Sequence, residues 1–411
     1  MIEKLGETTE KSVETTEKTI DKIKVVSDGL YYLAAVIYFV FSIIATSHVR
    51  TLLGSKMYIL IMAGMLGLLM LRELLGFIFV KRYGIREVIG LAICGFFWYI
   101  AEKNDSSILV CSYLLVFASR NADMKKVYRI IFITMVLTCS AIFLLAENNV
   151  ILNSIYYDEG RFRHIFGFHY QLIPPCHLLN ITMVFAVLKS EKISFSEIGI
   201  LFFLNGALYR WCRADLSGAV TLIVLLFMIL VKLYPKLLTS DFPLWTLLDR
   251  IAVIIFPLCM ALSLGLSILY SDSVGWMKAL DDATRGRLHY PQQAIQRYGF
   301  SMLGQSINFI GIGVDGGSHG GEYDYVDNLY ISLLLRYGTI FVVIGILLLT
   351  VTMYYLYQKN MRIWLWMLSL WALHGLLEDR MHLVYFNSLL LIIGQAVQNV
   401  RMELLCRKTN C

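Results

Sequence analysis

The feature that most constrains this chain is a succession of apolar runs, each close to the length that crosses a lipid bilayer. A transmembrane helix needs about 20 predominantly apolar residues, and such runs recur from near residue 29 to near residue 400. Only 16% of the residues are charged, against roughly 25% in soluble domains. The alternating ten-residue segments typical of a membrane β-barrel are absent from the sequence. The sequence therefore predicts an all-α, polytopic membrane protein.

Twelve transmembrane helices can be placed on these runs. The predicted spans lie near residues 29–47, 57–80, 85–101, 107–118, 128–146, 171–189, 195–210, 215–232, 250–270, 327–357, 361–377 and 382–400. Together they form one membrane domain, 29–411, preceded by a charged, threonine-rich segment at 1–28. That segment lacks the apolar core and cleavage site of a signal peptide. We expect it to be a cytosolic amphipathic helix or a tail.

Basic residues predict which way the chain lies in the membrane. Lysine and arginine are enriched in cytosolic connections of membrane proteins, and most of those in this chain fall on the side of the N-terminus when the spans are alternated. Both termini are therefore expected to be cytosolic. The longest polar stretch, the loop 271–326 with its glycine-rich patch at 311–321, is expected on the opposite, extracytoplasmic side.

Most of the basic residues that break this rule are arginines, and several of them lie at the outer ends of spans. They form three pairs in the sequence: Arg161 and Arg163, Arg210 and Arg213, and Arg285 and Arg287. An arginine at membrane depth costs roughly 2.5–3.5 kcal/mol, whereas its planar guanidinium grips phosphate at two points. Each pair alone is compatible with snorkelling to lipid headgroups. Three pairs on one side favour an anionic ligand handled at the outer face.

A segment before the sixth span combines cations, histidines and aromatic side chains. Residues 160–170 contain Arg161, Arg163, His164 and His169 among several aromatic residues. Aromatic residues at this depth ordinarily form the interfacial belt of a membrane protein. The same mixture suits a sugar that lies on aromatic rings with its phosphate on arginine.

A candidate acid–base pair lies near the outer end of the eleventh span. His374 and Glu378 are four residues apart, which places them on one face of a helix. A histidine and a carboxylate there are suited to serve as base and orienting group in a glycosyl transfer; the alternative is a hydrogen-bonded pair at a helix end. We expect no metal, because neither this motif nor Glu322, Asp324 and Asp327 has the spacing of a zinc or calcium site.

The order of these elements resembles a known family. The elements are Arg163 to His169; Tyr209 to Arg213 followed by Leu216-Ser217-Gly218; Gly286-Arg287; Asp327, Asn328 and Tyr330; Tyr337-Gly338; and His374, Gly375 and Glu378. With the long loop before the tenth span, this order resembles the O-antigen polymerase and ligase superfamily, in particular the Wzy-type polysaccharide polymerases. The chain departs from the family pattern at Tyr170-Gln171, where Pro-Asn is usual, and at Cys212, where serine is usual.

The resemblance implies a metal-independent, GT-C-like glycosyltransferase without a cofactor, in the cytoplasmic membrane of a bacterium. It would join polyprenyl-diphosphate-linked oligosaccharide repeats at the outer leaflet, with His374 and Glu378 catalytic. The arginine pairs, His169, Asp327, Asn328 and Tyr330 would bind substrate. The implied partners are membrane lipids and the flippase and chain-length regulator of the same pathway, with no nucleic acid. An O-antigen-type ligase, a polysaccharide transporter or flippase, and a non-catalytic membrane scaffold are the alternatives.

Overall fold

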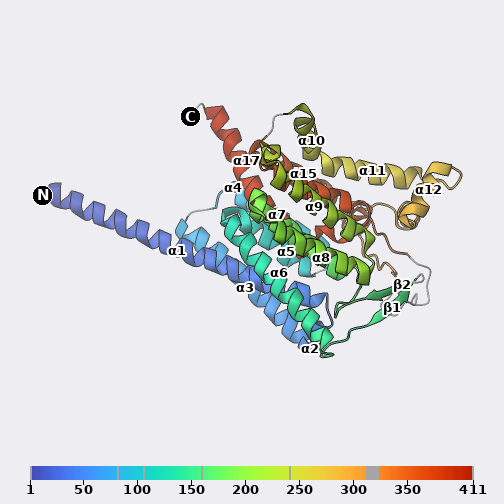
Figure 1. Cartoon of the computed structure of the whole chain (residues 1–411). Helices are drawn as coiled ribbons and strands as arrows, with labels where there is room; N and C mark the ends of the chain where they lie inside the picture. The colour runs from blue at the N-terminus through green and yellow to red at the C-terminus, as the bar shows by residue number, and fades with distance from the viewer. Residues whose placement is uncertain are drawn as a thin grey trace.

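The computed structural model shows a chain that is helical almost throughout (Figure 1). It describes residues 2–80, 83–104, 107–158, 161–239, 242–311 and 324–409, with side chains for all of these except 2–18, 80, 107, 108, 158, 161 and 401–409. Most of the predicted glycine-rich patch, and with it part of the loop 271–326, lies outside the described residues.

Most of the described helices overlap the predicted runs, and two further helices, Gly275–Thr284 and His289–Tyr298, lie in the predicted loop 271–326. The first half of the chain forms α1 (Ile2–Ala45), α2 (Val49–Leu53), α3 (Ser55–Val80), α4 (Ile85–Glu102), α5 (Ser107–Ala118), α6 (Met124–Glu147), the hairpin β1 (Ile155–Asp158) and β2 (Arg161–His164), α7 (Ile173–Lys189) and α8 (Phe195–Cys212). The second half forms α9 (Asp215–Leu233), α10 (Pro243–Val253), α11 (Ile255–Leu269), α12 (Gly275–Thr284), α13 (His289–Tyr298), α14 (Leu329–Tyr337), α15 (Thr339–Gln358), α16 (Arg362–His374) and α17 (Ile392–Thr409).

Short 3-10 turns join several of these helices. They are η1 (Ser119–Asn121), η2 (Ser190–Lys192), η3 (Pro235–Leu238), η4 (Arg380–His382) and η5 (Ser388–Leu391). Within the described residues, the antiparallel pair β1–β2 is the one sheet, with Tyr156 opposite Arg163 and Tyr157 opposite Phe162.

Six described helices are long and apolar enough to cross a membrane, or seven if the pair α10–α11, bent by 64°, counts as one span. A helical membrane protein therefore agrees with the structure, whereas twelve crossings remain a prediction. The two numbers differ because several predicted runs form helices that are too short or too polar to cross a membrane by themselves. Examples are α5, with 12 residues, and α16, with 13.

The predicted tenth span, 327–357, is two helices that meet at a glycine. Gly338 separates α14 from α15 with φ +88°, and a Cβ there would lie 2.3 Å from the backbone nitrogen of Gly304. Residues 301–305 pack into this corner, where Thr339 N donates to Ser301 O and Gln305 N donates to Arg336 O. A side chain at residue 338 would therefore push the loop away from the corner.

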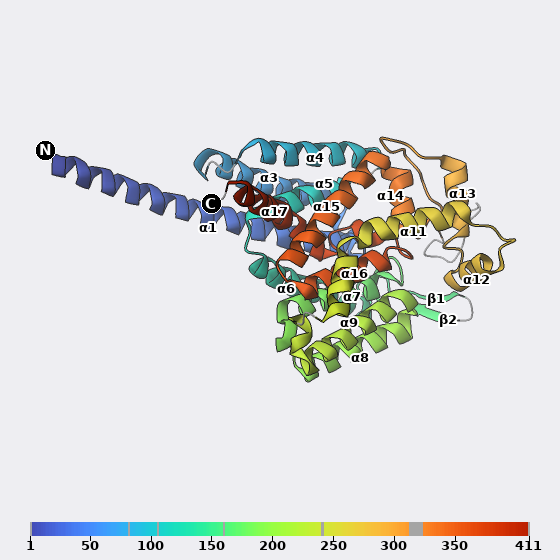
Figure 2. The ribbon, with the colours of Figure 1, turned by 90° about the horizontal axis from the view of Figure 1, so that it is seen from above.

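The bundle has two distinct ends. Figures 1 and 2 show both termini toward one end, and α12, α13 and the β1–β2 hairpin at the other. Figure 2 also shows α4 and α8 on opposite edges, with α16 and α7 between them. Fully buried aromatic residues such as Tyr38 of α1 and Trp371 of α16 belong to the main core, while α3 and α8 carry exposed apolar residues such as Ile59 and Phe203. Such an apolar exterior suits contact with lipid.

Candidate functional site

A cavity of about 770 Å³ lies at the end of the bundle that carries α12 and the hairpin. Its wall is formed by β2 and the segment after it, by the α8–α9 turn and by the α12–α13 turn. Asp327, just before α14, and Leu377 and Glu378, just after α16, complete it. Its polar lining residues are Arg163, Tyr170, Arg213, Asp215, Ser217, Thr284, Arg285, Arg287, Tyr290, Asp327 and Glu378. This volume is within the range of roughly 300–1,000 Å³ typical of small-molecule sites.

Six residues that the sequence singled out line this one cavity. They are Arg163, Arg213, Arg285, Arg287, Asp327 and Glu378. They come from segments that are far apart in the sequence, so the fold itself brings them together. One member of each of the first two predicted arginine pairs, Arg163 and Arg213, and both members of the third, Arg285 and Arg287, therefore meet at one cavity. We name this space the arginine cavity.

The α12–α13 turn holds Arg287 through a network of backbone contacts. The carboxylate of Asp281 accepts hydrogen bonds from Leu288 N at 2.8 Å and His289 N at 2.9 Å. Gly286 has φ +83°, and a Cβ there would lie 2.4 Å from the Tyr290 ring. The turn therefore requires glycine at residue 286, and it presents Arg287 toward Asp327, where Nη2 and Oδ2 are 3.0 Å apart.

Arg213 and Arg285 both occupy left-handed positions at the ends of helices. Arg213 directly follows α8 and has φ +54°, and Arg285 directly follows α12 and has φ +58°. Positive φ is uncommon for residues other than glycine, and such outliers often lie at functional sites. Arg285 Nη2 lies 3.4 Å from Asp215 Oδ2, with both side chains about half exposed. Arg213 has no acidic partner among the described residues, and its buried Nε has no hydrogen-bond partner.

Asp327 and Glu378 line the arginine cavity and belong to an acidic cluster with Asp379. Carboxylate oxygens of Asp327, Glu378 and Asp379 lie within 4.8 Å of one another. Arg287 contacts Asp327, and Arg380 Nε lies 3.5 Å from Glu378 Oε1, so two arginines already offset part of this charge. Glu378 Oε1 and Asp379 Oδ1 are nevertheless buried without a hydrogen-bond partner among the described residues.

Glu378 differs from an ordinary surface carboxylate. Its side chain is buried, and burial, reinforced by Asp379 and Asp327 and opposed by Arg380, raises its pKa to about 7. Asp379, which directly follows, is also buried and accepts a hydrogen bond from Tyr325 Oη at 2.8 Å. A carboxylate whose pKa is near neutral is suited to exchange protons with a substrate hydroxyl.

His374 lies one hydrogen bond behind the cavity wall. Helix α16 ends at His374, and turns follow it, so the expected common helix face with Glu378 is not formed. His374 is buried, and its Nε2 lies 3.2 Å from Ser217 Oγ, which lines the arginine cavity. The imidazole therefore reaches the cavity through Ser217, whereas Glu378 faces it directly.

Asn328 connects the two acidic segments of the site. Its Nδ2 donates to Leu376 O at 3.0 Å and to Ser263 Oγ at 3.0 Å, and its Oδ1 accepts from Ile331 N at the start of α14. Leu329 N donates to Gly375 O at 2.8 Å. These contacts fix Asp327 beside Glu378, so the structure gives the buried Asn328 a positioning role.

None of the other predicted residues whose side chains are described lines the arginine cavity. Tyr330 is buried and donates to Ala372 O at 2.8 Å. His169 lies beside His48, with ring centroids 4.6 Å apart. Arg210 is exposed and is not part of the cavity lining. The side chain of Arg161 lies outside the described residues.

The sequence interpretation missed Asp215 and Tyr290, and it included Tyr170 only as one aromatic residue of the segment 160–170. Tyr170, Asp215 and Tyr290 line the cavity, and the guanidinium of Arg380 lies 5.3 Å from the centre of the Tyr170 ring. Asp215 lies two residues after Arg213, and this position in the sequence could have identified it as a candidate site residue. No sequence pattern could have identified Tyr290, because it packs against Gly286 and only the fold reveals that contact.

Comparisons with known proteins give no relative. No family model matches the chain, and neither the curated proteins nor the solved structures contain a match. What the arginine cavity does chemically therefore has to follow from its own residues.

Proposed function

We propose that this protein is a membrane glycosyltransferase that joins polyprenyl-diphosphate-linked oligosaccharide repeat units into a polysaccharide at the outer leaflet of a bacterial cytoplasmic membrane. The observation that carries the proposal is the convergence of Arg163, Arg213, Arg285 and Arg287 on one cavity that also contains Glu378. This set offers both a site for a departing diphosphate and a base for an incoming hydroxyl.

The arginines supply the diphosphate site. Four guanidinium groups face the carboxylates of Asp215, Asp327 and Glu378, so the lining is cationic even when all three acids are ionised. Guanidinium groups bind phosphate oxygens through paired hydrogen bonds. Donors fixed around a developing anion stabilise the transition state, typically by a few kcal/mol for each group. A diphosphate leaving group gains most from this arrangement.

Glu378 supplies the base. In the proposed step, the bond between the anomeric carbon of the growing chain and its diphosphate breaks, and the lipid diphosphate leaves with the electron pair. A hydroxyl of the incoming lipid-linked repeat forms the new bond to that carbon. The hydroxyl proton moves to the carboxylate of Glu378, whose raised pKa favours accepting it near neutral pH.

The arrangement of the bundle agrees with a site on the outer face. The arginine cavity lies at the end opposite both termini. With the termini in the cytosol, as the basic residues predict, the cavity opens where a lipid-linked repeat arrives after transport across the membrane. The flippase that delivers such a repeat, and a chain-length regulator, are the proposed partners.

The test uses the purified full-length protein in proteoliposomes with a synthetic polyprenyl-diphosphate-linked repeat. We expect a ladder of lipid-linked polymers, and we expect Arg213→Ala to abolish most of it while Arg129→Ala does not, because Arg129 is exposed on α6 away from the cavity. Failure of the wild type to lengthen the repeat would overturn the proposal. In a strain lacking the protein, single repeats on the carrier support a polymerase, whereas full-length unattached chains indicate a ligase.

A further inference from the structure

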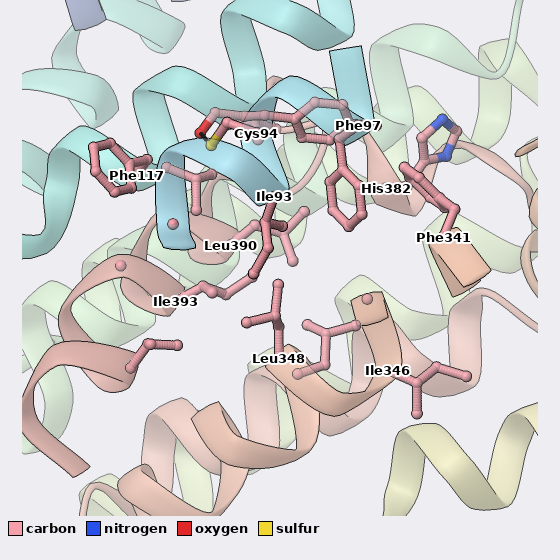
Figure 3. A pocket seen from close by; sticks show the side chains of 18 of the residues that line it. Ile93, Cys94, Phe97, Phe117, Phe341, Ile346, Leu348, His382, Leu390 and Ile393 are labelled. Carbon is pink, nitrogen blue, oxygen red and sulfur yellow. Dashed lines mark hydrogen bonds between the residues drawn. The ribbon is translucent and has the colours of Figure 1, made fainter. Parts of the chain in front are cut away.

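A second cavity, of about 330 Å³, lies between α4, α5, α15 and α17. Figure 3 shows side chains from these elements directed toward a common space, among them Ile93, Phe117, Leu348 and Ile393. Most of its lining is aliphatic or aromatic, and it shares no lining residue with the arginine cavity. We name it the apolar cavity.

Aromatic rings close one end of the apolar cavity. The rings of Phe97 on α4 and Phe341 on α15 have centroids 4.3 Å apart, and Tyr113 and Tyr337 pack against the same pair. Between this closure and the other end, the lining residues on α4 and α15 are almost all apolar. A flexible hydrocarbon chain is the ligand that such a slot suits, because it gains from burial and needs no hydrogen bonds.

The other end of the apolar cavity is cationic. It is lined by Arg86, Glu87, Arg120 and Gln398. Glu87 uses its carboxylate to accept a hydrogen bond from Gly84 N at 2.7 Å, at the start of α4. Arg86 has no hydrogen bond or ion pair with the described residues, so its charge is available to a ligand.

Arg120 belongs to a buried cluster with more positive than negative charge. Its Nη2 lies 2.6 Å from Glu73 Oε2, but Arg72 also contacts the same carboxylate. Arg120 is 7% exposed, and its Nε is buried without a hydrogen-bond partner. Because one carboxylate serves two buried arginines, the cluster retains an excess cation beside the cavity. A buried excess charge is costly unless an anion offsets it.

We infer that the apolar cavity binds an anionic phospholipid, with one acyl chain between α4 and α15 and the headgroup phosphate at Arg86 and Arg120. Basic pockets between transmembrane helices commonly hold anionic headgroups on the cytoplasmic side. The arginine end is formed by the start of α4, η1 and α17, and α17 leads to the C-terminus. It therefore lies toward the end of the bundle that carries the termini, which the basic residues assign to the cytosol.

The polyprenyl tail of the proposed substrate is a less suitable ligand for the apolar cavity than a phospholipid, because of Arg86 and Arg120 at its cationic end. Its diphosphate would occupy the arginine cavity at the opposite end, and the tail would bring no anion to Arg86 and Arg120. A bound phospholipid satisfies both the hydrocarbon slot and the cationic end. The inference therefore stands independently of the proposed reaction.

Native mass spectrometry of the delipidated full-length protein tests this inference. The probes are phosphatidylglycerol and phosphatidylcholine with the same acyl chains. We expect one phosphatidylglycerol to be retained at least about tenfold more tightly than phosphatidylcholine. Gly345→Leu should weaken this binding by a similar factor, because Gly345 lines the cavity and a Cβ there meets open space. The matched control is Gly95→Leu, since Gly95 on α4 also has open space but does not line the cavity.

A second pair of variants tests the headgroup end. Arg86→Gln should weaken phosphatidylglycerol binding more than phosphatidylcholine binding and so reduce the preference between the two lipids, whereas Arg129→Gln, on an exposed face of α6, should leave the preference unchanged. Thermal unfolding of each variant verifies that it is folded. Equal retention of the two lipids by the wild type, undiminished binding to Gly345→Leu, or displacement of phosphatidylglycerol by an equimolar polyprenyl phosphate would overturn the inference.

Discussion

Arg287 Nη2 lies 3.0 Å from Asp327 Oδ2, and this ion pair joins the turn after α12 to the residue that begins the approach to α14. Both side chains line the arginine cavity and are largely buried. The pair therefore has two consequences. It fixes the large loop against the helical bundle, and it keeps one guanidinium edge at the cavity wall.

Arg287→Lys is expected to lose most polymerising activity, by about 10²-fold, while the amount of protein in the membrane is unchanged. Lysine keeps the positive charge but cannot form the paired contact with phosphate. The measurement is the rate of polymer formation in proteoliposomes. Arg210→Lys is the control, because Arg210 is exposed outside the cavity, and it should retain normal activity. A normal rate for Arg287→Lys would show that the site needs only charge.

Gly286→Ala is expected to reduce activity by displacing Arg287. The new Cβ would lie 2.4 Å from the Tyr290 ring, at a residue whose φ is +83°. Gly299→Ala is the matched control, because residue 299 has φ +64° and open space around its Cβ. The control carries the backbone penalty of about 1 kcal/mol without the collision. Equal polymer formation by the two variants would show that the Tyr290 contact does not position Arg287.

The helices could be predicted from the sequence, but their breaks could not. Hydropathy located most of the described long helices because burial in lipid or in the core requires apolar side chains, but the predicted last span, 382–400, overlaps α17 (Ile392–Thr409) only in part. The division at Gly338 was invisible, because it depends on the backbone of residues 302–304 packing against that glycine. The bend between α10 and α11 similarly falls inside one uninterrupted apolar run.

The lining of the arginine cavity could be predicted where a charged side chain lies near a membrane span, but not where it depends on contacts between distant segments. Arg163, Arg213, Arg285 and Arg287 were identified because arginine near a membrane span is costly. The relation between His374 and Glu378 was expected from helical spacing, and α16 ends too early to form it. Residues that contribute by packing, such as Tyr290, cannot be recognised from a sequence pattern.

The orientation predicts opposite labelling of two engineered cysteines. In a background whose natural cysteines are replaced by serine, cysteine at Lys278 on α12 should react with an impermeant maleimide in intact cells. Cysteine at Lys408, near the C-terminus, should react only after permeabilisation, because basic residues place both termini in the cytosol. Labelling of residue 408 alone in intact cells would reverse the orientation and place the arginine cavity inside.

His374→Ala is expected to lower turnover through Ser217. The imidazole and the serine hydroxyl are joined by a 3.2 Å hydrogen bond, and only the serine lines the cavity. General acid–base groups contribute about 10²–10⁴ in rate, and a positioning residue should give a loss at or below the lower limit. Ser217→Ala should reproduce the defect, and the double variant should add little to it. Independent, multiplicative losses in the two variants would contradict the coupling.

Glu378→Gln is expected to remove the pH dependence of the reaction near neutrality. Burial raises the pKa of Glu378 from 4.5 to about 7, so the carboxylate is protonated below that pH and cannot accept a proton. The wild-type rate should therefore rise with pH between about 6 and 8 and then level off, while the variant should be slow and flat. The free energy of unfolding should fall as pH rises, which is opposite to the change in rate. Because the folded protein holds this proton more tightly than the unfolded chain does, the contribution of neutral Glu378 is present at low pH and is lost as pH rises from 4.5 to about 7. Glu147→Gln, on an exposed carboxylate at the end of α6, is the control and should keep the wild-type profile. A Glu378→Gln variant with the wild-type inflection would assign the base to another group.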